Sequence, residues 1–159
     1  MERKDEALGV WGTPPDLFAY YDQEFHFTLD VCALPANARC PAYFSPADDG
    51  LRQSWSGTCW CNPPYGHGQL KFWVKKAYQE AQAGATVVML IPARTNETWW
   101  HRYCLRAAEV RFFLGGLKFT GMDSALACLP LCLVVFRPGC QGPPTVSTAA
   151  KIVTGRRRK

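Results

Sequence analysis

The run Thr86-Val-Val-Met-Leu-Ile91 is the feature that most constrains this chain, because every position after the first is apolar. A strand with one face in water alternates apolar and polar residues, whereas a strand covered on both faces does not. Uninterrupted apolar strands are typical of parallel sheets that have helices packed on both sides. Residues 86–91 therefore predict the central strand of a three-layer α/β domain.

The rest of the chain supplies the helices and strands that such a domain needs. From Gln69 onward the apolar residues follow the spacing of one helix face, and Gly84 is well placed to end that helix. A capping hydroxyl at Thr13, followed by two prolines, predicts a helix that ends near Asp22. Further strands are expected at 27–31, 58–61, 109–114 and 129–136, and a further helix at 97–107. Because strand and helix alternate through the middle of the chain, the sheet should be largely parallel.

The chain is expected to form a single domain over residues 8–137, followed by a basic, disordered tail over residues 138–159. Lys151 and Arg156-Arg157-Arg158-Lys159 place five cations in the last nine residues, within a formal net charge of +5. Such a tail suits a polyanion such as nucleic acid, and it equally suits a role in solubility alone. No stretch approaches the roughly 18 apolar residues of a membrane span, and the charged N-terminus does not have the pattern of a signal peptide. We therefore expect a cytoplasmic protein with no membrane partner, located in the bacterial host if a phage encodes it.

The eight cysteines raise the alternatives of disulfides or a zinc site. They form no Cys-x-x-Cys unit, and zinc requires closely grouped ligands. Cys59 and Cys61 stand in one apolar strand-like stretch, and Cys128 and Cys132 stand in or beside another. A reduced cysteine in such a stretch behaves as a small hydrophobic residue. We therefore expect reduced cysteines in the core and no metal ion.

Polar and unusual residues fall where three of the expected strands end, at 30–33, 62–65 and 92–94. In open parallel sheets, ligands bind beyond the carboxyl ends of the strands. The sequence therefore predicts a ligand site at that edge of the sheet.

The tetrapeptide Asn62-Pro63-Pro64-Tyr65 stands at one of these strand ends. The amino nitrogen of adenine is a poor nucleophile because its lone pair is delocalised into the ring. The side-chain oxygen of Asn62 and a carbonyl fixed by Pro63 could each accept one amino hydrogen and so localise that lone pair. Tyr65 offers a flat face on which an extruded base can stack. The alternative is an ordinary turn that ends a strand, with the tyrosine in packing.

Several segments, taken together and in this order, point to a known family. They are Trp11-Gly-Thr-Pro-Pro-Asp-Leu-Phe18, Phe27-Thr-Leu-Asp-Val-Cys-Ala33, Asn37-Ala-Arg-Cys40, Asp49-Gly-Leu51, Trp60-Cys-Asn-Pro-Pro-Tyr-Gly66, Met89-Leu-Ile-Pro-Ala-Arg-Thr95 with Trp99-Trp100-His101, and residues 113–119. Over residues 11–136 the chain thereby resembles the phage-type N-6-adenine DNA methyltransferases, a Dam-like family. The resemblance implies a reduced Rossmann-like fold that depends on S-adenosylmethionine.

The resemblance also implies roles for individual residues. The expected cofactor-binding residues are Trp11, Thr13, Pro14, Asp30, Ala33, Asn37 and Asp49, with Thr13 and Pro14 at the methionine end and Asp49 at the adenine. The expected catalytic residues are Asn62, Pro63, Pro64 and Tyr65, and the expected DNA-binding residues are Arg94 and Lys118. Simpler roles stay open beside these: a helix cap for Thr13, a turn for Asp49, loop shaping for Asn37 and a surface position for Arg94.

The sequence thus predicts transfer of a methyl group from S-adenosylmethionine to the N6 amino group of adenine in double-stranded DNA, by a monomer or weak dimer. One alternative is an RNA or protein-glutamine methyltransferase of the same fold, and another is a catalytically silent DNA-binding protein. The chain departs from the family pattern at Gly116 and at residues 128–132, and the expected first strand is not followed by a glycine-rich turn.

Overall fold

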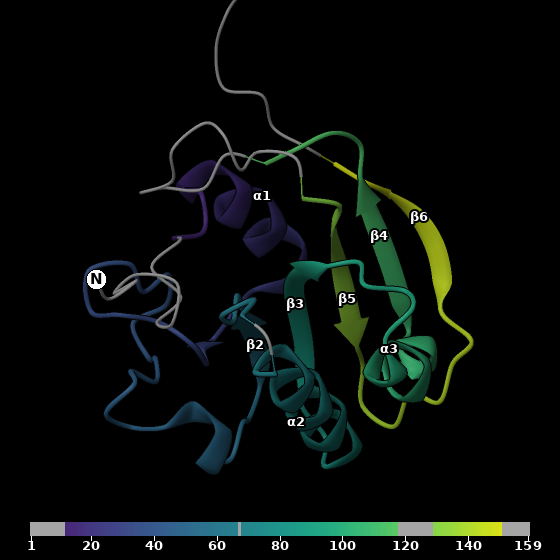
Figure 1. Ribbon diagram of the computed structural model, residues 1–159. Helices are drawn as coiled ribbons and strands as arrows, with labels where there is room; N and C mark the ends of the chain where they lie inside the picture. The colour runs from purple at the N-terminus through teal and green to yellow at the C-terminus, as the bar shows by residue number, and fades with distance from the viewer. Residues whose placement is uncertain (1–11, 67, 118–128, 151–159) are drawn as a thin grey trace, which may run out of the picture.

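A six-stranded sheet in the order β1-β2-β3-β5-β4-β6 forms the centre of the molecule (Figure 1). The computed structural model describes residues 12–66, 68–117 and 129–150. The strands are β1 (Leu29–Asp30), β2 (Thr58–Cys61), β3 (Thr86–Pro92), β4 (Glu109–Phe113), β5 (Leu131–Phe136) and β6 (Thr145–Ala149). The helices are α1 (Pro15–Phe25), α2 (Leu70–Gln82) and α3 (Thr98–Arg102), with 3₁₀ turns η1 (Gly50–Arg52) and η2 (Cys104–Arg106).

The sheet is largely parallel, as the alternation of strand and helix predicts. The strand β2 pairs in parallel with β1 and β3, and β4 pairs in parallel with β6. Only β5 among the strands of the described ranges runs the other way, between β3 and β4. The strands β4 and β5 follow one another in the chain and pair directly, and an antiparallel pair needs no helical crossover.

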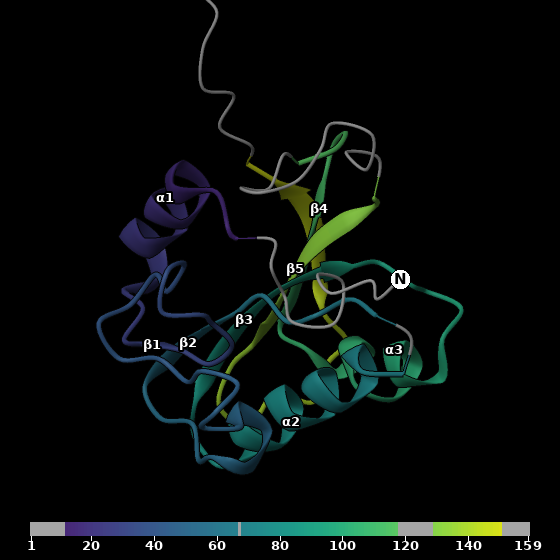
Figure 2. The ribbon, with the colours of Figure 1, turned by 60° about the vertical axis from the view of Figure 1, so that its left-hand side comes forward.

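Helices cover both faces of the sheet, which confirms the three-layer arrangement expected from β3 (Figure 2). On one face, α1 packs through Phe18 against Trp60, with ring centroids 5.7 Å apart in an edge-to-face geometry. On the other face, Tyr78 of α2 meets Phe136 of β5 at 6.3 Å. Every residue of β5 and every residue of β3 after Thr86 is buried. No helix within the described ranges is long and apolar enough to cross a membrane.

The helices and strands differ from the expected ones mainly in where they begin and end. Helix α1 continues to Phe25, where His26 adopts a left-handed conformation that ends it. Strand β1 covers only two residues, although N–H groups of Thr28 and Val31 on either side also donate to carbonyls of β2. The helix expected at 97–107 stops at Arg102, and the 3₁₀ turn that follows places Cys104 in the core.

The expectation that residues 138–159 are a disordered tail is wrong for residues 145–149, which form β6. Three of its five residues are polar and only Ala149 is buried, so the segment lacks the apolar pattern by which a strand is recognised in a sequence. Backbone pairing with β4 holds it at the edge of the sheet, and the hydroxyl of Tyr21 donates to the carbonyl of Ala150 at 2.8 Å. Its carboxyl end lies at the same edge as those of β1, β2 and β3. The basic residues from Lys151 onward lie outside the described residues.

The cysteines of the described ranges are free thiols, and five of them belong to the hydrophobic core. These five are Cys40, Cys59, Cys61, Cys104 and Cys132. Burial raises the pKa of the Cys132 thiol to about 12, so the group stays protonated and uncharged. Within the part of the chain that the structure describes, no cluster of His, Cys, Asp and Glu side chains could hold a metal ion. The prediction of core cysteines is confirmed for these five, and Cys128 lies outside the described residues.

Candidate active site

The three strand ends singled out in the sequence meet at one edge of the sheet. The strands β1, β2 and β3 are neighbours and run in parallel, so their carboxyl ends lie side by side. Residues 30–33, 62–65 and 92–94 follow directly from these ends. The three segments therefore lie together at one edge of the sheet, as the sequence predicts.

The side chain of Asn62 is held at both ends of its amide. Its Nδ2 donates to the hydroxyl Oγ1 of Thr13 at 3.1 Å, and its Oδ1 lies 2.9 Å from the hydroxyl of Tyr65, which can donate to it. The same tyrosine hydroxyl lies 2.9 Å from the carbonyl of Leu90 in β3. One amide is thus fixed between the segment before α1 and the neighbouring strand.

Tyr65 is buried, with 9% of its surface exposed. Burial raises the pKa of its hydroxyl well above the usual range, so the group keeps its proton and can donate it. The hydroxyl lies within hydrogen-bond distance of two acceptors, Asn62 Oδ1 and the carbonyl of Leu90, between which its single proton is shared. Beyond the flat face expected for base stacking, Tyr65 therefore supplies a polar atom that orients Asn62.

Thr13 does not cap α1, contrary to the expectation. The N-cap of α1 is Pro14, and no side chain bonds to the first turn. The buried hydroxyl of Thr13 instead accepts from the indole of Trp60 at 3.0 Å and from Asn62. A cap would keep the hydroxyl beside the first turn of the helix, whereas the partners observed here come from β2 and its carboxyl end.

Arg94 binds the backbone of the tetrapeptide. Its guanidinium donates to the carbonyl of Tyr65 at 2.8 Å, and the side chain is half-buried. The sequence left open whether Arg94 contacts a DNA phosphate or lies free on the surface. The structure shows a third arrangement, in which Arg94 fixes the turn that carries Tyr65.

Asp30 is 3% exposed and accepts two backbone N–H groups, from Arg39 at 3.0 Å and from Cys32 at 3.4 Å. Burial raises the pKa of its carboxyl to about 6, although the hydrogen bonds from Arg39 and Cys32 oppose the shift. The guanidinium of Arg39 in turn donates to the backbone carbonyl of Thr13, with its Nε at 3.0 Å. Asp30 and Arg39 together fasten the loop after β1 to the segment before α1.

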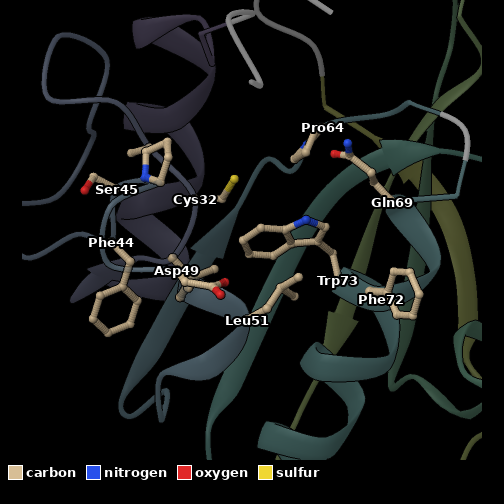
Figure 3. A pocket seen from close by; sticks show the side chains of 13 residues that line it. Cys32, Phe44, Ser45, Asp49, Leu51, Pro64, Gln69, Phe72 and Trp73 are labelled. Atoms are coloured by element: carbon tan, nitrogen blue, oxygen red, sulfur yellow. The ribbon is translucent and has the colours of Figure 1, made fainter. Parts of the chain in front are cut away.

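A cavity of about 220 Å³ opens beside these residues, beyond the ends of β1 and β2 (Figure 3). Of the expected cofactor-binding residues, Ala33 and Asp49 line it, together with Pro64 of the tetrapeptide. Thr13, Pro14, Asp30 and Asn37 do not line it. Asn37 accepts the N–H of Leu34 at 2.8 Å, which matches its loop-shaping alternative. Trp11 and Lys118 lie outside the described residues.

Most of the cavity wall consists of residues that the sequence analysis did not single out as site residues. They are Val31, Cys32, Phe44, Ser45, Pro46, Gly50, Leu51, Gln69, Phe72 and Trp73. The labelled side chains of Figure 3 surround the indole of Trp73, which the helix pattern places on the core face of α2. Trp73 also stacks on Trp55 at 6.2 Å between ring centroids, so one side chain contributes to both the core and the cavity.

Gly50 is required where the loop after Asp49 passes behind this cavity. A Cβ at Gly50 would lie 2.3 Å from the carbonyl oxygen of Val31 and 3.3 Å from the Trp73 ring. Asp49 before it adopts a left-handed conformation with φ of 53°. Asp49 and Gly50 both line the cavity.

Comparison with known proteins identifies the family. The chain matches the family described as DNA N-6-adenine-methyltransferase (Dam) over residues 2–128. The chain belongs to this family. It is 31% identical over 144 residues to the DNA N-6-adenine-methyltransferase of Haemophilus phage HP1, which covers 85% of this chain and 82% of the relative. It is 28% identical over 109 residues to the DNA N-6-adenine-methyltransferase of Escherichia phage T1, which covers 67% of this chain and 45% of that protein.

The predicted activity is that of the family, so this chain is a DNA methyltransferase that acts on the N6 amino group of adenine. The matched region contains the tetrapeptide, the cavity wall and Arg94. Methyl transfer requires a methyl donor and an adenine to meet at one place. The cavity and Asn62 share the carboxyl edge of the sheet, and Pro64 belongs to both the tetrapeptide and the cavity wall.

We expect the replacement Asp30→Asn to remove a pH dependence from the stability of this site. The folded state raises the Asp30 pKa to about 6 from 3.8, so it binds more protons than the unfolded state between these values. The contribution of Asp30 to the free energy of unfolding should therefore fall as pH rises through this window, by on the order of 3 kcal/mol. The variant has no titrating group at this position, so its free energy of unfolding does not contain this decrease.

Urea unfolding of both proteins from about pH 4 to pH 8 measures this difference, and the other titrating groups cancel in the comparison. The advantage of the wild type over Asp30→Asn should be larger at the acid end than at the neutral end. Parallel curves for the two proteins would contradict the environment assigned to Asp30.

Proposed function

We propose that S-adenosylmethionine is the methyl donor and that it binds in the cavity beside the tetrapeptide. The single observation that carries this proposal is the contact between the cavity wall and the catalytic turn at Pro64. When bound there, S-adenosylmethionine supplies an electrophilic methyl group on a sulfonium. The residues of the chain then have to hold the donor, present the adenine amino group and exclude water.

The cavity fits the nucleoside end of this cofactor. Its wall combines aromatic rings of Phe44, Phe72 and Trp73 with the single carboxylate of Asp49. Flat apolar walls suit a purine ring, and a carboxylate can accept hydrogen bonds from ribose hydroxyls or a base amino group. At about 220 Å³ the cavity is smaller than the roughly 300–1,000 Å³ of ligand pockets, so it holds part of the cofactor. The methionine end then lies toward Thr13 and Pro14, in agreement with the roles that the resemblance implies.

We assign Asp30 a positioning role. Its carboxylate lies behind the cavity and is occupied by backbone N–H groups of Cys32 and Arg39. Cys32 lies in the cavity wall itself. Asp30 thus shapes the loop that carries the wall.

The amide of Asn62 is the acceptor for the target amino group. A carbonyl oxygen can accept two hydrogen bonds, and the Tyr65 hydroxyl can supply one of them to Oδ1. In the complex, one amino hydrogen of adenine supplies another, and the carbonyl of Pro63 accepts the second amino hydrogen. This draws the nitrogen lone pair out of the ring and directs it at the methyl group. The adenine must leave the duplex stack to reach this position.

The DNA contacts expected at Lys118 and in residues 151–159 remain predictions, as do cytoplasmic location and a monomer or weak dimer. Arg94 has guanidinium N–H groups beyond the one that binds Tyr65, so it can contact a DNA phosphate while it fixes the turn. The strand β6 ends at the same edge of the sheet as the tetrapeptide, where Tyr21 binds the carbonyl of Ala150. This position favours a role in DNA binding for the basic residues that follow.

The replacement Asn62→Ala should lower the rate of methyl transfer by about 10²–10³, because the lost acceptor acts mainly in the transition state. Affinities for cofactor and DNA should change little. The measurement is transfer of a labelled methyl group from S-adenosylmethionine to DNA from a methylation-free host, with mass analysis of the nucleosides. Asn96→Ala is the matched control, since Asn96 is exposed in the loop before α3.

Wild-type protein should produce N6-methyladenine and no other methylated base. Methylation confined to RNA or protein, or a wild-type rate in Asn62→Ala, would contradict the proposal.

The replacement Asp49→Ala should weaken binding of S-adenosylmethionine by about ten- to a hundredfold, the range for a hydrogen bond to a charged group. Asp16→Ala on α1 removes the same charge from another exposed position and should leave the affinity unchanged. Isothermal titration calorimetry measures both variants. An unchanged affinity in Asp49→Ala would remove the cofactor from this cavity.

A further inference from the structure

A second hollow, of about 340 Å³, lies between α2 and α3, which lie next to each other below the sheet in Figure 2. Its wall includes Lys71, Phe72, Lys75, Glu97, Arg102 and Tyr103. We call it the α2–α3 groove. The proposed mechanism assigns nothing to it.

The groove carries an excess of positive charge. Lys71, Lys75 and Arg102 face one acid, Glu97, which leaves two net positive charges. All four side chains are exposed, and none makes a hydrogen bond or ion pair with any other described residue. The next lysine, Lys76, differs because it pairs with Glu80 one turn later on α2. The cations of the groove are therefore available to a partner with negative charge.

An exposed aromatic ring joins the groove to the cofactor cavity. Phe72 is 54% exposed and lines both hollows. The ammonium group of Lys71 lies 5.1 Å from its ring centroid. A large ring left half in water beside free cations combines the two contacts that nucleic acids use, stacking and charge.

The two helices of the groove start close in the chain to the tetrapeptide and to the arginine that binds it. Lys71 is the second residue of α2, which starts soon after Tyr65 in the chain. On the other side, Arg94 binds the carbonyl of Tyr65, and the N–H of Glu97 donates to the carbonyl of Arg94 at 3.1 Å. Helix α3 starts directly after Glu97. One wall therefore follows the tetrapeptide in the chain, and the other follows the arginine that binds it.

We propose that the α2–α3 groove holds the sugar–phosphate backbone of the DNA next to the target adenine. This inference rests on the proposed function, because it concerns the DNA that the tetrapeptide methylates. The cations match phosphates spaced along a strand, and arginine can bind a phosphate with two N–H groups. The Phe72 ring packs against a sugar of this backbone, and the carboxylate of Glu97 opposes the binding.

The sharpest test compares two arginines four residues apart. Arg102→Gln removes a cation from the groove, whereas Arg106→Gln removes one from η2, before the start of β4 and so at the opposite edge of the sheet. Each replacement removes one positive charge from an exposed side chain, so both variants have the same net charge. Arg102→Gln should weaken binding of an adenine-containing duplex roughly two- to fivefold and lower the salt slope by about one unit. Arg106→Gln should change neither value.

Two further variants extend the test to both signs of charge. Lys71→Gln with Lys75→Gln should lower the salt slope by about two units, and Glu97→Gln should tighten DNA binding. Affinity for S-adenosylmethionine and the kcat at saturating DNA should stay at the wild-type values in Arg102→Gln, since the groove binds only the DNA backbone. Fluorescence anisotropy over a salt series measures binding, and steady-state methyl transfer gives KM and kcat.

Equal weakening in Arg102→Gln and Arg106→Gln would show an effect of net charge and overturn the proposal. An unchanged salt slope in Arg102→Gln, or weaker DNA binding in Glu97→Gln, would overturn it as well. Failure of the proposed function is seen separately, because Asn62→Ala would then methylate DNA at the wild-type rate.

Discussion

The parallel alignment of β1, β2 and β3 is the constraint on which the site depends. Parallel neighbours carry all their carboxyl ends to one edge, so segments from three distant parts of the chain meet there. The antiparallel β5 does not disturb this, because it pairs on the far side of β3. The strands β4 and β6 end at the same edge, and β6 carries the chain toward it before the basic residues begin.

Hydrogen bonds at this edge hold the side-chain amide of Asn62 in one position. The indole of Trp60 and the amide of Asn62 both donate to the hydroxyl of Thr13. The hydroxyl of Tyr65 lies between Asn62 Oδ1 and the backbone carbonyl of Leu90 in β3, which share its single proton. A buried polar group without a partner costs free energy, so each of these contacts restricts the others. Arg94 and Arg39 fix the backbone on either side of this chain of contacts.

The sequence predicted those parts of the fold that have a periodic signal. The apolar run at 86–91 and the helical spacing after Gln69 correspond to β3 and α2. Strand β6 was missed because three of its five residues are polar, and because it is held by pairing with β4, which no local pattern shows. Trp73 was assigned to the core, and its spacing could not show that the same ring also faces the cavity.

Roles that depend on contacts between distant residues were the least predictable. Thr13 stands 49 residues before Asn62, and only the folded sheet brings its hydroxyl to that amide. The sequence favoured Thr13 as a helix cap because the local pattern fits a helix start. The hydroxyl of Tyr65 had no predicted role, because stacking needs only the ring. The place of the tetrapeptide at the end of a strand was predictable, whereas the contacts that orient its side chains were not.

The central claim is that the Tyr65 hydroxyl orients Asn62 for catalysis, and a double-mutant cycle on methyl transfer tests it most directly. Tyr65→Phe should lower kcat about five- to tenfold, the effect of one hydrogen bond worth about 1–1.5 kcal/mol, with unchanged affinity for cofactor and DNA. In the background of Asn62→Ala the same replacement should cause no further loss, because the amide that it orients is gone. Tyr20→Phe, at an exposed tyrosine of α1, controls for the change of residue type. The same loss of kcat in both backgrounds, or no loss in either, would contradict the account.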